Sequence, residues 1–241
     1  MRKLVTRIIP VLCLLAAFPL AAQDAREIMQ KNRDIPDGDS FRRSNVLLIV
    51  KSGKNEKKEF KTVSKEYGRK VRTRMKFTYP TDMRYLSWDA PGEENQQWIK
   101  LSSGKVRKIA SSEKDSPWMN SHFYREDLSE NYIEEYDYRL LGEETVDGVV
   151  CHKIESVKNT GQKVYSRRII YIGKEDYLTY RVDFFENGRH TKTLTVSGYE
   201  KIDGIQTARK LIMERTDGKG KSILYTKSVD YNVSVDDREL T

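Results

Sequence analysis

Runs that alternate apolar and polar residues fill much of the chain. Residues 71–77, 178–184 and 223–231 show this period of two most clearly. A period of two is typical of a β-strand with one buried face. X-Gly pairs, which supply the positive φ angles of tight hairpin turns, separate the later runs. They stand at Asp147-Gly148, Asn187-Gly188, Asp203-Gly204 and Asp217-Gly218. The pattern predicts an antiparallel sheet built from consecutive hairpins.

The same reasoning, applied to the whole chain, predicts a mainly β protein with about 11 to 12 strands. The expected strand ranges are 46–50, 58–67, 71–77, 84–88, 97–101, 105–109, 136–144, 149–156, 163–172, 177–185, 191–199, 207–215 and 222–233. Strand twist accumulates across a sheet of this size, so the sheet curls. We therefore expect an incomplete antiparallel β-barrel.

One or two short helices are expected to cover the concave face of this barrel. The first is predicted from Asp24 to Arg33, where Asp24 and Glu27 have capping-box spacing. Residues 111–135 break the strand rhythm and predict a long loop with a helical turn at 126–128. Long loops in compact domains are often lids or binding elements.

The N-terminus has the pattern of a cleaved signal peptide, expected to span residues 1–22. Arg2, Lys3 and Arg7 precede an apolar stretch from Ile8 to Leu20, and small residues follow. At about 13 residues this stretch is too short to cross a bilayer. The expected mature protein is a single domain, residues 23–241. It retains one of the two cysteines, Cys151, so no internal disulfide is expected.

Charge and motifs disfavour several classes of protein. The net charge of +8 is modest, three of the cations lie in the leader, and the others are interleaved with acids. A nucleic-acid binder more often gathers its cations on one face, so no nucleic-acid partner is expected. HExxH, CxxC and G-x-S-x-G motifs are absent from the sequence. We therefore predict no enzyme, no metal site and no cofactor.

Without catalytic groups, the apolar concave face is the candidate functional site. A barrel of about twelve strands is wider than its own side chains comfortably fill, and small-molecule pockets are mostly apolar. For each candidate, a purely structural role in the core is the alternative to lining a lipid pocket. The candidate ligand-binding residues are Met75, Phe77, Leu86, Trp88, Trp98, Trp118, Phe123 and Phe184.

The block from Lys76 to Leu128 carries a series of short motifs. It reads K-F-x-x-P-x-D-x-R, then L-x-W, P-G, Q-W-I and V-R-K-I, and finally W-M-N-S-H-F-Y-R-E-D-L. In this order the block resembles the outer-membrane lipoprotein-sorting protein family, the LolA-like carriers. The likeness continues to residue 237. Two departures lie at the expected mouth of the cavity: residues 100–102 replace Tyr-Leu-Pro, and residues 120–123 replace Gly-Ser-Asp-Phe.

This resemblance implies an unclosed barrel and a periplasmic, non-enzymatic carrier of lipid or lipoprotein acyl chains. It also implies two partners, an inner-membrane exporter of the resistance-nodulation type and an outer-membrane acceptor. The carrier is expected to be a monomer. Two alternatives stay open. One is a lipid-sensing or regulatory module that acts with such a transporter. The other is a secreted hydrolase, which would need Asp, Glu or His clustered in a cleft.

Overall fold

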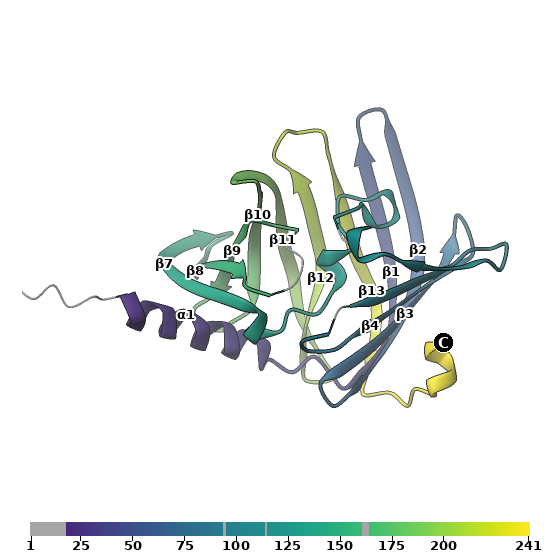
Figure 1. Ribbon diagram of the computed structural model, residues 1–241, viewed down its shortest axis with the longest axis horizontal. Coiled ribbons are helices and arrows are strands. Elements are labelled where there is room, and N and C mark those ends of the chain that lie inside the picture. The colour runs from purple at the N-terminus through teal and green to yellow at the C-terminus, as the bar shows by residue number, and fades with distance from the viewer. Residues whose placement is uncertain (1–17, 94, 114, 161–163) are drawn as a thin grey trace, which may run out of the picture.

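The computed structural model describes residues 18–93, 95–113, 115–160 and 164–241, and within them the chain forms one α-helix and thirteen β-strands (Figure 1). The elements are α1 (Phe18–Arg33), β1 (Ser40–Lys51), β2 (Lys54–Tyr67), β3 (Lys70–Tyr79), β4 (Met83–Asp89), β5 (Gln96–Lys100), β6 (Val106–Ile109), β7 (Tyr136–Val146), β8 (Val149–Lys158), β9 (Arg167–Gly173), β10 (Thr179–Glu186), β11 (Arg189–Ile202), β12 (Ile205–Arg215) and β13 (Gly220–Tyr231). Short 3-10 turns occupy Ser111–Glu113, Trp118–Asn120, Glu126–Leu128, Ile133–Glu135 and Asp237–Leu240. The turn predicted at 126–128 is therefore present.

All thirteen strands belong to one antiparallel sheet, in the order β6-β5-β4-β3-β2-β1-β13-β12-β11-β10-β9-β8-β7. Each half of the chain is a meander, and the pairing of β1 with β13 joins the two halves. The outer strands of the sheet, β6 and β7, are its two edges, so the curled sheet is not closed. The predicted open antiparallel barrel is confirmed. Its thirteen strands correspond to the thirteen expected ranges, although the expected number of strands was about 11 to 12.

The N-terminal helix lies against β7, below the left half of the sheet in Figure 1. Its buried side chains Ala25, Ile28 and Met29 join the main apolar core. The predicted start at Asp24 is wrong, because the helix already includes Phe18–Gln23 and Asp24 does not cap it. Ala and Leu in that stretch favour continuation of a helix. Residues 1–17 of the expected leader lie outside the described residues.

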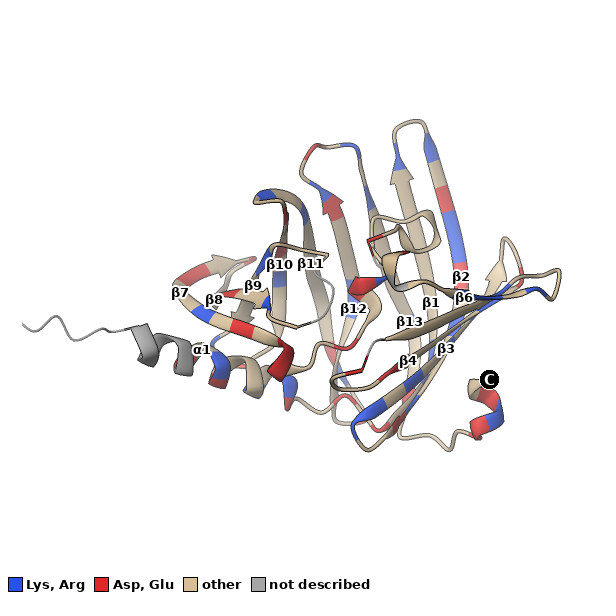
Figure 2. Cartoon of the chain, in the orientation of Figure 1, with Lys and Arg blue, Asp and Glu red and all other residues tan. Residues whose placement is uncertain are grey.

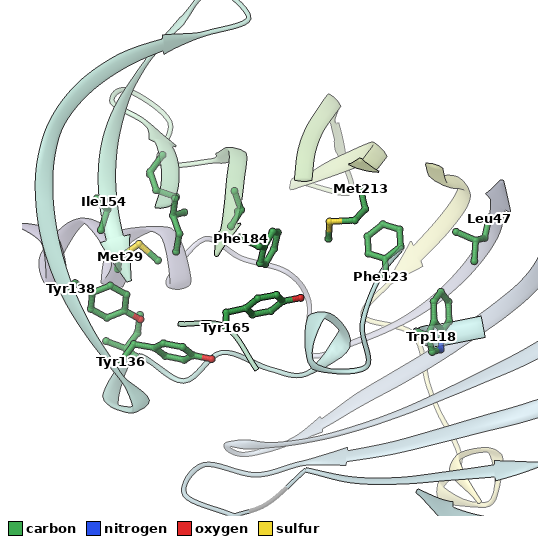
Figure 3. Close-up of a cluster of buried hydrophobic side chains, with 14 of the residues drawn as sticks. Met29, Leu47, Trp118, Phe123, Tyr136, Tyr138, Ile154, Tyr165, Phe184 and Met213 are labelled. Atoms are coloured by element: carbon green, nitrogen blue, oxygen red, sulfur yellow. The ribbon is translucent and has the colours of Figure 1, made fainter. Parts of the chain in front are cut away.

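Apolar clusters cover both faces of the sheet. The largest one fills the concave face (Figure 3), and three smaller clusters lie on the outer face. In one of these, Leu240 and Val235 from the C-terminal segment cover Val63 of β2. The concave face therefore holds the main core and is also the face that the predicted site would use. No helix in the described part of the chain is long and apolar enough to cross a membrane.

Candidate functional site

We call the concave face of the sheet the hollow. Its floor consists of buried apolar side chains that both meanders contribute, and Figure 3 shows several of them pointing toward one another. They include Leu47 and Ile49 of β1, Phe60 of β2, Phe77 of β3, Tyr85 of β4, Ile154 of β8, Phe184 of β10 and Met213 of β12. Such a floor needs further apolar atoms above it to exclude water.

A segment between the two edge strands supplies these atoms. Residues 115–135, which we call the cover, run across the hollow and insert Trp118 and Phe123 among the floor residues (Figure 3). Trp118 is only 1% exposed. Its ring lies 5.6 Å from Phe60 and 5.9 Å from Phe77, measured between centroids. The hollow is therefore filled by a separate segment as well as by the strands.

The central part of the cover, residues 117–129, makes no backbone-to-backbone hydrogen bond to the sheet. Backbone-to-backbone hydrogen bonds of residues 117–129 run within the cover, for example from the Trp118 amide to the Phe123 carbonyl at 2.8 Å. The Arg125 amide likewise donates to the Ser116 carbonyl at 3.3 Å. Side chains make the ties to the sheet in this stretch. Displacing the cover would therefore leave the strand ladders intact.

The most buried of these ties is an ion pair. Lys192 of β11 is 3% exposed, and its Nζ lies 2.9 Å from Oδ2 of Asp127. The Lys192 ammonium also lies 3.4 Å from the ring centroid of Tyr124. Asp127 further accepts from the Tyr165 hydroxyl at 2.5 Å and from the Tyr124 amide at 2.7 Å. Burial lowers the pKa of Lys192, and Asp127 opposes that shift.

Further polar ties lie along the cover. Lys158 of β8 donates to Glu126 at 2.8 Å, where both side chains are largely buried. His122 donates its backbone amide to the Ser222 hydroxyl of β13 at 3.0 Å, and its Nδ1 lies 2.8 Å from the same oxygen. Buried polar groups that lose such partners are costly. The ties therefore hold the cover in one position.

A cleft of about 510 Å³ marks the seam between the cover and the strand ends. The cover contributes Pro117, Ser121, His122 and Tyr124 to its lining. The strands and their hairpin turns contribute Lys51, Ser52, Glu186, Thr191, Lys192, Arg215 and Lys219. Most of the lining residues have polar side chains, and four cations stand against one acid, Glu186. Water therefore reaches the seam next to the buried ion pair.

The structure separates the predicted site residues into two groups. Four of them, Phe77, Trp118, Phe123 and Phe184, pack together in the hollow, and Met75 packs against them. The other three, Leu86, Trp88 and Trp98, lie on the opposite face of β4 and β5. A single pocket lined by all eight residues is therefore excluded. Contact of either group with a ligand stays a prediction.

Several residues of the site were not predicted. Tyr85 pairs with Met75 across β3 and β4, so the hairpin register places it on the floor. Lys192 shares a strand face with Leu194 and Val196, both apolar. A lone cation in such an alternation signals a buried charge that needs a partner. The partner, Asp127, lies in the irregular cover and has no comparable signal.

A family model described as "Uncharacterized protein" matches residues 69–241. The chain belongs to this family. No curated protein matches the sequence. Among solved structures, a DUF1329 family protein from Desulfovibrio piger is 27% identical, with a TM-score of 0.87 over 92% of this chain and 97% of the other.

Two further solved structures are similar to this chain over most of its length. An outer membrane lipoprotein-sorting protein domain from Vibrio parahaemolyticus is 22% identical, with a TM-score of 0.86 over 91% of this chain and 97% of the other. A LolA superfamily protein from Nitrosomonas europaea is 17% identical, with a TM-score of 0.71 over 90% and 97%. The resemblance found in the sequence is confirmed, and the fold is LolA-like.

Proposed function

We propose that the protein is a periplasmic carrier that binds lipid or lipoprotein acyl chains in the hollow and delivers them toward the outer membrane. One observation carries this proposal: an open apolar sheet is filled by a cover whose backbone makes no part of the sheet ladder. The leader pattern and the lipoprotein-sorting relative support the location and the direction of transport.

In this proposal the cover and the acyl chain exchange places. Trp118 and Phe123 occupy the floor when no cargo is bound. An acyl chain that replaces them regains about 0.8 kcal/mol for each buried CH₂ group. Release of the cover breaks the tie between Lys192 and Asp127 but exposes both charges to water, which offsets part of the loss. The exchange therefore needs no covalent chemistry.

The proposed transfer steps involve two membrane partners, an inner-membrane exporter of the resistance-nodulation type and an outer-membrane acceptor. A carrier of this kind needs no catalytic group, so we propose no enzymatic activity. The carrier is proposed to act as a monomer, because the hollow is built from one chain and needs no second copy to complete it.

The position of Trp118 provides the test. In the variant Trp88→Phe/Trp98→Phe, the remaining tryptophan reports on the cover alone. As oleate binding approaches saturation, the Trp118 emission is expected to shift to longer wavelength and the ring is expected to become accessible to acrylamide. Native mass spectrometry measures that fraction in the same samples.

A matched variant controls for general loosening of the fold. Trp118→Phe keeps an aromatic ring in the cover, so this variant is expected to bind oleate with the same stoichiometry. It lacks the Trp118 fluorescence, so the change in emission and in acrylamide quenching that Trp118 gives should be absent. Either of two results would contradict the proposal: no oleate bound by the purified protein, or a Trp118 that stays shielded from acrylamide even when oleate binding is saturated.

A further inference from the structure

The outer face of β3–β6 carries a second pocket, which we call the outer pocket. Arg74 of β3 pairs with Leu86 of β4, and Leu86 pairs with Trp98 of β5, so the three side chains lie side by side. Their neighbours Met75 and Tyr85 point into the hollow instead. The sheet therefore separates the two sites. The outer pocket has a volume of about 460 Å³, within the range of small-molecule sites.

The floor of the outer pocket is apolar. It is formed by Leu86, Trp88 and Trp98, and Leu240 of the C-terminal turn closes one side. The Arg72 guanidinium lies 3.7 Å from the Trp88 ring centroid, which holds that indole in place. Val106, 59% exposed, stands at the pocket's edge on β6. An elongated apolar group would bury these surfaces.

Four cations and no Asp or Glu side chain line the outer pocket, which the last residue, Thr241, also lines. Arg72, Arg74, Arg84 and Lys100 line the pocket, and no ion pair involves them in the described ranges of the chain. Figure 2 shows Lys and Arg in blue along this part of the sheet. The Arg74 Nε is buried and has no hydrogen-bond partner in the described structure. Burial and the neighbouring Arg84 lower the pKa of Arg74.

Arginines elsewhere on the outer face show the contrast. Arg42 makes two hydrogen bonds to Glu239, at 2.5 and 2.8 Å, and Arg139 makes two to Glu155, at 3.1 and 2.9 Å. Glu239 is the acid whose charge acts on Arg74, but its carboxylate is hydrogen-bonded to Arg42. An anionic group in the outer pocket would supply the missing partner for Arg74 and Arg84.

We propose that the outer pocket binds a single-chain anionic amphiphile, with its carboxylate or phosphate at Arg74 and Arg84 and its acyl chain across Leu86 and Trp98. The apolar floor accounts for the chain, and the unpaired guanidinium groups account for the anionic head. This site does not depend on the proposed function of the hollow. It can bind a free lipid molecule while the cover stays in place.

The tryptophans of the floor are the reporters. In the variant Trp118→Phe, the remaining Trp88 and Trp98 both line the outer pocket. Dibrominated stearate, whose bromine atoms quench an indole on contact, is expected to quench their fluorescence saturably below the concentration at which it aggregates. The corresponding uncharged alcohol is expected to bind about tenfold more weakly, because it cannot pair with the guanidinium groups. A brominated lysophosphatidate compares the phosphate head with the carboxylate.

Charge variants test the head-group position. Arg74→Gln/Arg84→Gln is expected to weaken stearate binding about tenfold or more, with the far-ultraviolet circular dichroism spectrum and the Tm as checks of folding. The matched control Lys201→Gln/Lys227→Gln removes two exposed cations from β11 and β13 and is expected to leave binding unchanged.

Three results would overturn the proposal. They are no saturable quenching in the Trp118→Phe protein, equal binding of the acid and the alcohol, or quenching that requires anionic vesicles rather than free lipid. The two sites can fail separately. If the outer pocket binds no lipid, the fluorescence of Trp88 and Trp98 stays unquenched in the Trp118→Phe protein. If the proposed carrier function fails, Trp118 stays shielded from acrylamide in the Trp88→Phe/Trp98→Phe protein.

Discussion

The ion pair between Lys192 and Asp127 lies at the centre of the contact between sheet and cover, so Asp127→Asn is an informative perturbation. The Tyr165 hydroxyl donates to Oδ1 of Asp127 and the Tyr124 amide donates to Oδ2. With its single oxygen at the Oδ2 position, asparagine still accepts from the Tyr124 amide, and its NH₂ group at the Oδ1 position can donate to the Tyr165 hydroxyl oxygen instead. It removes the negative charge that faces a lysine only 3% exposed. The variant therefore removes the negative charge while it keeps a polar group at both positions.

The expected loss of stability is large. Breaking a buried ion pair by removing one partner typically costs about 3–5 kcal/mol, because the remaining charge stays buried without compensation. We expect about 3 kcal/mol here, since the carbonyl of His122 still accepts from Lys192 at 3.3 Å. If the cover leaves when lipid enters, the same change favours the open state. Apparent oleate affinity would then rise by up to about 150-fold.

Two assays read out the two effects. Urea unfolding measures the free energy of unfolding, and oleate titration measures the affinity. Lys192→Met/Asp127→Asn, which removes both charges, is expected to recover much of the lost stability. The reasoning is refuted if Asp127→Asn lowers stability as expected but binds oleate no more tightly than the wild-type protein does.

Two further predictions concern the fold. Burial raises the pKa of Asp89 from 3.8 to about 6, so the folded protein holds a proton that the unfolded chain releases between about pH 4 and pH 6. Stability should fall by about 3 kcal/mol as pH rises through that window, and urea unfolding of Asp89→Asn should lack this slope. Gly220 has φ 139°, and a Cβ there would lie 2.3 Å from the Val50 carbonyl oxygen. Gly220→Ala should therefore lose about 2 kcal/mol more than Gly148→Ala, which meets no atom within 4 Å; equal losses would contradict the steric argument.

Alternation and turn dipeptides located the strands well, because a period of two and a positive φ are local properties of the chain. Each of the predicted strand ranges overlaps one of the observed strands. The site was harder to predict, since the face that a residue occupies depends on the register between strands. Trp88 and Leu86 pair with Arg72 and Arg74, so the face of β3 that alternation marks as solvated carries the aromatic pocket.

The cover shows a second limit of sequence reasoning. Residues 115–135 have no periodicity, so their contacts depend on the three-dimensional shape of the hollow rather than on local propensity. The pairing of Asp127 with Lys192 joins positions 65 residues apart. Trp118 is among the candidates because it is large and apolar, and its contact with a ligand stays a prediction. Its place as a filler of the hollow emerges only from the fold.

Hydrogen exchange with and without bound oleate tests the central claim most directly, because it follows the cover and the floor in one experiment. We predict faster exchange in residues 116–129 on lipid binding, together with unchanged or slower exchange in β1, β10 and β12. Lipid-bound protein whose residues 116–129 exchange as slowly as those of the free protein would contradict the account.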